Sequence, residues 1–115
     1  MRSTAMAVLV LLGACQHSDV SRALGARCTT ADDCDDLCLP GDTPGMEPWP
    51  GGFCTRTCAM ASDCPGDTTC AGREGGVCLF TCGADADCEF LGDRWGCHDD
   101  DLHGGGIKVK VCRGS

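Results

Sequence analysis

Cysteine is the residue type in this sequence that could support the most chemistry, because 13 of the 115 residues are cysteines. Thiols form disulfides, bind metal ions or, as thiolates, act as nucleophiles. This density exceeds the roughly 8–10% that marks a disulfide scaffold in a short chain. No two cysteines enclose only two residues, the spacing found in many zinc sites, although three pairs enclose three residues, so structural zinc remains an alternative. The composition favours disulfides formed in an oxidising compartment.

Twelve of the cysteines form three units of four, each separated from the next by three residues. Every unit opens with a cysteine, four residues, an aspartate and a second cysteine. These aspartates are placed to accept hydrogen bonds from backbone amides in a tight turn, and the neighbouring Thr30, Ser62 and Asp85 to cap or brace it. Calcium binding is the alternative for Asp33, Asp63 and Asp87, but the spacing lacks a repeated loop of oxygen donors.

Four cysteines permit three pairings in each unit, and the sequence does not choose among them. We prefer first to third and second to fourth, because interlocked pairing closes both loops of a unit. Six such bridges, at about 2–4 kcal/mol each, would dominate the stability of a chain with so sparse a core. The preferred pairs are Cys28–Cys38, Cys34–Cys54, Cys58–Cys70, Cys64–Cys78, Cys82–Cys97 and Cys88–Cys112.

Glycine runs predict a short hairpin at the end of each unit. Gly pairs at 51–52 and 75–76 each precede an apolar residue and the fourth cysteine. In the third unit, three glycines precede a strand over 107–112, in which Ile107, Val109 and Val111 are expected to face inward and two lysines outward. Its expected partner is the segment over 94–97.

A cluster of imidazoles and carboxylates lies at 98–103. Nitrogen and oxygen donors at this density could bind a divalent cation, which makes His98, Asp99, Asp101 and His103 candidate metal ligands. We favour the alternative, an acidic hairpin tip in contact with solvent.

The longest insertion in the first unit contains Met46 and Trp49. Proline on both sides of Trp49 would stiffen an extended loop that presents the ring to a partner, so Trp49 and Met46 are candidate binding residues. The alternative is that Trp49 folds back onto the disulfides, because core residues are scarce.

The rest of the composition argues against two classes of function. The formal charge of −8 makes nucleic acid an unexpected partner, because phosphate binding needs a clustered basic surface. No serine lies in a nucleophile-elbow context, and the cysteines are better used in bridges than as thiolates. We therefore expect no enzyme activity and no cofactor.

Residues 1–15 have the pattern of an export signal. One early arginine precedes an apolar run of about eight residues, far short of the roughly 20 that span a bilayer. The run ends in Leu12-Gly13-Ala14-Cys15, which resembles the lipobox of bacterial lipoprotein precursors and implies lipidation of Cys15. Removing Cys15 from the count leaves twelve cysteines, an even number. An ordinary signal peptide with one unpaired cysteine is the alternative.

Two further resemblances concern the cysteine-rich part. Residues 58–70, CAMASDCPGDTTC, look like part of the whey acidic protein core, a family of protease inhibitors, but that core has adjacent cysteines where Ala71 follows Cys70 here. The whole chain resembles the cysteine-rich repeat lipoproteins of bacteria, a class without a general assigned activity.

Together these observations predict a small disulfide-rich fold of three four-cysteine units, with short β-hairpins and little regular secondary structure. The expected segments are a signal peptide over 1–14, a lipidated cysteine and tether over 15–27, and units over 28–57, 58–81 and 82–115. The expected function is a non-enzymatic binding or structural module, attached through its N-terminal lipid to the bacterial envelope, at the outer membrane, with an unknown protein or surface ligand. A protease inhibitor acting through an exposed loop and a divalent-metal-binding envelope protein are the alternatives.

Overall fold

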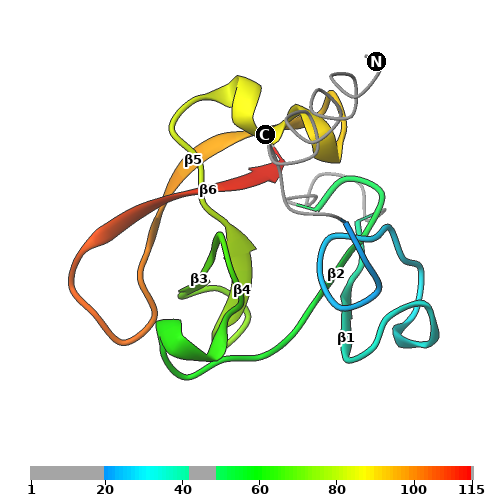
Figure 1. The fold of residues 1–115 in the computed structure, drawn as a ribbon, viewed down its shortest axis with the longest axis horizontal. Helices are drawn as coiled ribbons and strands as arrows, with labels where there is room; N and C mark the ends of the chain where they lie inside the picture. The colour runs from blue at the N-terminus through cyan, green and yellow to red at the C-terminus, as the bar shows by residue number, and fades with distance from the viewer. Residues whose placement is uncertain (1–19, 42–48, 115) are drawn as a thin grey trace, which may run out of the picture.

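Three β-hairpins, one from each four-cysteine unit, form the protein (Figure 1). The computed structural model describes residues 20–41 and 49–114. Each hairpin is antiparallel and follows a short 3-10 helix. In chain order the elements are η2 (Ala31–Asp33), β1 (Leu37–Leu39), β2 (Phe53–Thr55), η3 (Ala61–Asp63), β3 (Thr68–Ala71), β4 (Val77–Phe80), η4 (Asp85–Leu91), β5 (Trp95–Asp101) and β6 (Lys108–Gly114).

All six disulfides follow the preferred pairing, first cysteine to third and second to fourth in every unit. The third and fourth cysteines stand directly opposite each other in the hairpin, as Cys70 and Cys78 do in the second unit. They are bonded to the first and second cysteines of the unit, which lie before the 3-10 helix and at its end or, for Cys88, within it, and not to each other. Each unit is therefore a hairpin clamped onto a helical turn, and the predicted fold class is confirmed.

Glycine is required where the first hairpin turns. Gly51 and Gly52 have φ values of 81° and 85°, in the left-handed region that other residues rarely adopt. A Cβ atom on Gly52 would also overlap the carbonyl group of Cys28. Gly75 and Gly76 turn the second hairpin in the same way, with φ values of 83° and 111°. The glycine pairs therefore mark the hairpins as the sequence predicts.

Equivalent backbone contacts recur where one unit meets the next. The last residue of a unit bridges the residue before the fourth cysteine of the following unit, from Thr57 to Val77 and from Thr81 to Val111. Within the second and third units, the first cysteine donates its amide to the carbonyl oxygen two residues before the fourth, from Cys58 to Gly76 O at 3.0 Å and from Cys82 to Lys110 O at 3.1 Å. The repeat in the sequence is therefore a repeat in three dimensions.

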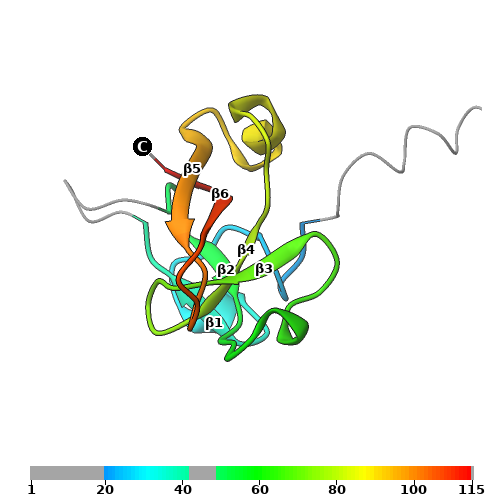
Figure 2. The same cartoon turned by 90° about the vertical axis from the view of Figure 1, so that its left-hand side faces the viewer.

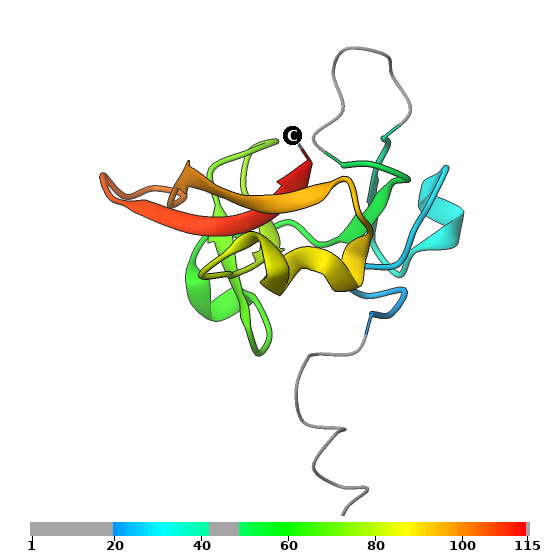
Figure 3. The same ribbon diagram turned by 90° about the horizontal axis from the view of Figure 1, so that it is seen from above.

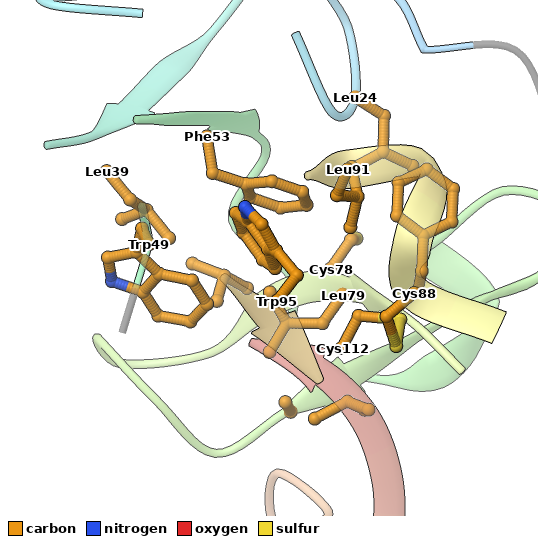
Figure 4. Close-up of a cluster of buried hydrophobic side chains, with 14 of the residues drawn as sticks. Leu24, Leu39, Trp49, Phe53, Cys78, Leu79, Cys88, Leu91, Trp95 and Cys112 are labelled. Carbon is orange, nitrogen blue, oxygen red and sulfur yellow. A yellow bond between two sulfur atoms is a disulfide. The ribbon is translucent and has the colours of Figure 1, made fainter. Parts of the chain in front are cut away.

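All five aromatic residues, two tryptophans and three phenylalanines, pack against one another at the junction of the units. Phe53 lies at the centre, with its ring centroid 5.3 Å from Trp95, 6.0 Å from Trp49 and 6.2 Å from Phe80. Figure 4 shows Trp49, Phe53 and Trp95 together among buried leucines. Units far apart in sequence thus share one core.

The third unit has the longest hairpin and the longest 3-10 helix. Helix η4 runs alongside the β5–β6 hairpin (Figure 3) and lies at the opposite end of the molecule from β1 (Figure 2). The expected partner segment over 94–97 lies largely in β5, but residues 108–112 of the expected strand pair with 97–101, because β5 continues beyond that segment. The inward orientation expected for Ile107 is wrong: this residue precedes β6 at the hairpin tip and is 62% exposed, while Val111 is buried.

Within the described residues, no helix has the length and apolar character needed to cross a membrane.

Candidate functional site

The aspartate before the second cysteine closes the turn of each unit, as predicted. Asp63 Oδ2 accepts the amides of Ala59 at 2.9 Å and Met60 at 3.2 Å. Asp33 and Asp87 accept the two equivalent amides in their own units. These hydrogen bonds, from Thr29 and Thr30 to Asp33 and from Ala59 and Met60 to Asp63, lower the pKa of both carboxyls below the ordinary value.

The residues expected to brace the turns differ from unit to unit. Thr30 Oγ1 accepts the amide of Asp32 at 3.3 Å and caps η2. In the second unit the N-cap position is occupied by Met60, so Ser62 does not have the expected capping role. Asp85 Oδ1 accepts the amide of Cys97 at 2.9 Å and so joins η4 to β5. Asp85 therefore links two elements of its unit.

The lowered pKa values predict a loss of stability in acid. A carboxyl whose folded pKa lies below its unfolded value contributes stability above the unfolded pKa, near pH 4, and loses it as the pH falls through the folded pKa. We expect Asp63→Asn to flatten the dependence of the unfolding free energy on pH below about pH 4. Urea unfolding of the oxidised chain at several acidic pH values measures this. Asp36→Asn, at an exposed position outside the turn, is the control; equal acid dependence in both variants would contradict the prediction.

Each unit gathers its sulfur atoms into one cluster. The Sγ atoms of the first, second and fourth cysteines all lie within 4.8 Å of one another, and the third cysteine is bonded to the first. The three groups are Cys28, Cys34 and Cys54; Cys58, Cys64 and Cys78; and Cys82, Cys88 and Cys112. The two disulfides of a unit are therefore immediate neighbours.

The candidate binding role of Trp49 on an exposed loop is wrong. Its side chain is 2% exposed and packs against Phe53 and Trp95, because the aromatic core needs residues from the first unit. Trp49 thus has the packing role that was the alternative. Met46, the second candidate, lies outside the described residues, as does the candidate lipidation site Cys15.

The histidine and aspartate cluster is spread along the third hairpin and does not converge on one point. Asp99 and Asp101 form exposed ion pairs with Lys110 at 3.2 Å and Lys108 at 2.9 Å across the strands. Asp101 raises the pKa of Lys108. Among the described residues, no group of three potential ligand atoms within 4.8 Å includes His98, Asp99, Asp101 or His103. The four weak metal candidates therefore remain separate, and two of them are paired with lysines.

Asp100, between these exposed aspartates, is buried and links two units. Its carboxylate accepts hydrogen bonds from Arg73 Nε at 3.0 Å and Arg113 Nε at 3.2 Å. Arg73 belongs to the second hairpin and Arg113 to β6. The Asp100 side chain is 9% exposed, so the two guanidinium groups replace most of its contact with water.

We expect Asp100→Ala to lower the unfolding free energy by about 2 kcal/mol, because two partly buried arginines lose their shared anion. The matched control is Asp99→Ala, whose exposed pair with Lys110 is worth less than about 0.5 kcal/mol. Urea unfolding with intact disulfides measures both variants. Equal losses would show that burial of Asp100 does not matter.

A hollow of about 520 Å3 lies between η4 and the start of β5. It is lined by Asp85, Glu89, Asp93, Trp95, Gly96 and His98. The three carboxylates are exposed at its rim, whereas Trp95 is buried. His98 Nε2 is buried and, within the described residues, makes no hydrogen bond. The hollow therefore combines negative charge with one polar atom that still lacks a partner.

The sequence singled out His98 as a candidate metal ligand and Asp85 as a brace for a turn, but not their position together with Glu89 and Asp93. The spacing of these acidic residues provided no signal, because Asp85 and Glu89 are four residues apart in a 3-10 helix of three residues per turn, and Asp93 follows the end of η4. Packing of η4 beside β5 brings these residues next to His98.

Comparison of the chain with protein-family models, with curated proteins and with solved structures gives no match.

Proposed function

We propose that this protein is a non-enzymatic binding module, exported by a bacterium and held at its envelope by lipid on Cys15. The observation that supports this most is the completeness of the disulfide pairing. All twelve cysteines from Cys28 onward are bonded within their own units. Cys15 is the single cysteine left over, and it lies where the signal sequence resembles a lipobox.

The six disulfides also support a module that works outside the cytoplasm, because disulfides persist in oxidising compartments. A lipidated cysteine with more than one acyl chain would anchor the protein stably, whereas one chain gives only marginal membrane binding. Gln16, the residue after Cys15, is not the aspartate associated with retention at the inner membrane of enteric bacteria, so we propose the outer membrane.

Mass analysis of protein made in an exporting host tests this proposal. We expect a mature N-terminus at Cys15, a mass increase from acyl chains on that residue, and six bridges confined to their units under non-reducing digestion. Cys15→Ser should abolish lipid attachment and leave all six bridges in place. A mature chain that begins elsewhere, or Cys15 recovered as a free thiol, would overturn the lipid anchor.

The hollow between η4 and β5 is the surface that we propose for ligand binding. Three carboxylates favour a positively charged group such as an amine, and His98 Nε2 offers one further hydrogen-bonding partner. The Cys82–Cys97 disulfide joins the segment before η4 to β5, and the Cys88–Cys112 disulfide joins η4 to β6. These two bridges hold the elements around the hollow rigidly in place. Rigid elements hold binding groups with little loss of conformational entropy.

Titration with a short lysine-containing peptide, followed by backbone amide resonances, tests the binding surface. We expect shifts centred on residues 85–98 that weaken with added salt, as attraction between exposed charges does. Glu89→Gln combined with Asp93→Asn should remove most of the binding, while Asp36→Asn, far from the hollow in the first unit, should not. Equal losses in the two variants would assign the effect to net charge alone.

A further inference from the structure

We propose that one face of the folded protein rests on the bilayer that holds Cys15. This face consists of residues 20–24 and 65–67, and we call it the docking surface. The docking rests on the proposed lipid anchor, and it adds a fixed orientation and a lipid contact that an anchor alone does not require.

Only a short link separates the lipid from the folded part of the chain. Residues 20–27 pack against the first unit, where Gly25 donates its amide to Cys54 O at 2.8 Å. The five steps from Cys15 to Val20, at about 3.5 Å per extended residue, reach no more than about 18 Å. The end of the protein around Val20 therefore stays closest to the membrane.

Apolar groups line this end of the protein. Val20 is 44% exposed. A Cβ atom on Gly25 would lie 3.4 Å from Val20 Cγ2 and 3.1 Å from Phe80 Cε2, so Val20 stands beside Phe80 at the edge of a hollow of about 340 Å3. The hollow is lined mainly by apolar groups, from Ala23, Leu24, Pro65 and Phe80, with Asp67 as the acidic residue among them. Burial of apolar area at a membrane interface favours binding of such a surface.

The distribution of charge favours the same orientation. Residues 16–27 contain two arginines and one aspartate, whereas residues 28–115 contain six basic and sixteen acidic residues. An anionic bilayer attracts basic residues near its surface and repels acidic ones. Arg22 is 58% exposed in its pair with Asp35, and an exposed pair contributes little, so Arg22 is available to lipid phosphate.

The bilayer, and not an acyl chain of Cys15, is the occupant that these observations favour. An acyl chain drawn into the hollow would leave the bilayer, where each buried methylene group contributes to anchoring. Contact of the docking surface with the membrane interface requires no such exchange. The contact can be weak in itself, because a short link holds the surface beside the membrane at an effective concentration of about millimolar.

An indole placed at each end of the protein tests the orientation. Val20→Trp reports on the docking surface. Ile107→Trp is the matched control, because Ile107 is 62% exposed and the tip of the β5–β6 hairpin lies on the opposite side of the protein from residues 20–27 (Figure 1 and Figure 3). The unsubstituted chain gives the background from its buried tryptophans.

Each lipidated, oxidised chain is reconstituted into vesicles of phosphatidylcholine and phosphatidylglycerol that contain a lipid spin-labelled at its headgroup. The label quenches indoles that it contacts. We expect the indole introduced by Val20→Trp to lose most of its fluorescence, and the indole introduced by Ile107→Trp to keep it.

A charge added at each end provides a second readout. In chains that carry Val20→Trp, Ala23→Asp should weaken the docking about fivefold, because it adds a negative charge beside an anionic surface. Ile107→Asp adds the same charge at the far tip and should leave the quenching unchanged.

Mass analysis of every chain establishes the lipid on Cys15 and the six bridges, so the anchor and the docking are tested separately. A lipidated chain in which both indoles are quenched alike, or neither is quenched, would overturn the docking and leave the anchor in place. A chain without lipid on Cys15 would overturn the anchor and the docking together.

Discussion

Phe53→Ala is expected to lower the unfolding free energy of the oxidised protein by about 3–5 kcal/mol. The Phe53 side chain is completely buried, and its ring contacts Trp49, Phe80 and Trp95. Removal of the ring leaves a cavity where residues of all three units meet. Intact disulfides in the surrounding hairpins limit how far the neighbours can move to fill it. Urea unfolding under non-reducing conditions measures the loss.

Met60→Ala is the control for this variant, because Met60 is 59% exposed and its truncation should change stability by less than about 0.5 kcal/mol. Phe53→Leu should fall between the two, since it retains part of the apolar volume. A loss below about 1 kcal/mol for Phe53→Ala would mean that the disulfides alone hold the units together.

Loss of the Cys88–Cys112 bridge, through alanine at both positions, is expected to cost about 3–4 kcal/mol. This bridge spans 24 residues, the largest separation of the six, and joins η4 to β6. A longer closed loop restricts the unfolded chain more, so its bridge contributes more stability. Both sulfurs are also buried, which adds a packing loss.

The Cys28–Cys38 bridge provides the comparison, because it spans only 10 residues and should cost about 2–3 kcal/mol when both cysteines become alanine. Peptide mapping first confirms the five remaining bridges in each variant. Thermal unfolding then shows which of the two bridges contributes more stability. A larger loss for the shorter loop would mean that native packing around the bridge, and not loop length, decides its contribution.

The disulfide framework could be predicted from the sequence because its determinants are local. The spacing of the cysteines defines the units, the aspartate defines the turn, and the glycine pairs define the hairpins. Each of these acts within about 30 residues. The strand expected over 107–112 corresponds to β6 (Lys108–Gly114), and its place in one hairpin with β5 could be predicted for the same reason.

Contacts between units could not be predicted in this way. Trp49 has proline on both sides, which suits an exposed loop, yet it is buried because Phe53 and Trp95 offer it apolar surface. Ile107 continues the alternation of its strand but extends beyond the core and is exposed. The acidic hollow depends on packing of η4 against β5. The spacing of residues within each element does not predict how one element packs on another.

The interlocked bridges also determine how the protein would carry mechanical load. If it is pulled between Cys28 and Cys54, tension crosses from Cys28 to Cys38, returns along four residues to Cys34 and crosses to Cys54. In the second and third units the shorter path follows the six residues from the first cysteine to the second and then crosses the Cys64–Cys78 or the Cys88–Cys112 bridge. At about 3.5 Å per extended residue, most of the chain is shielded from stretching. A single cut in the backbone between two bonded cysteines would likewise leave the pieces covalently joined.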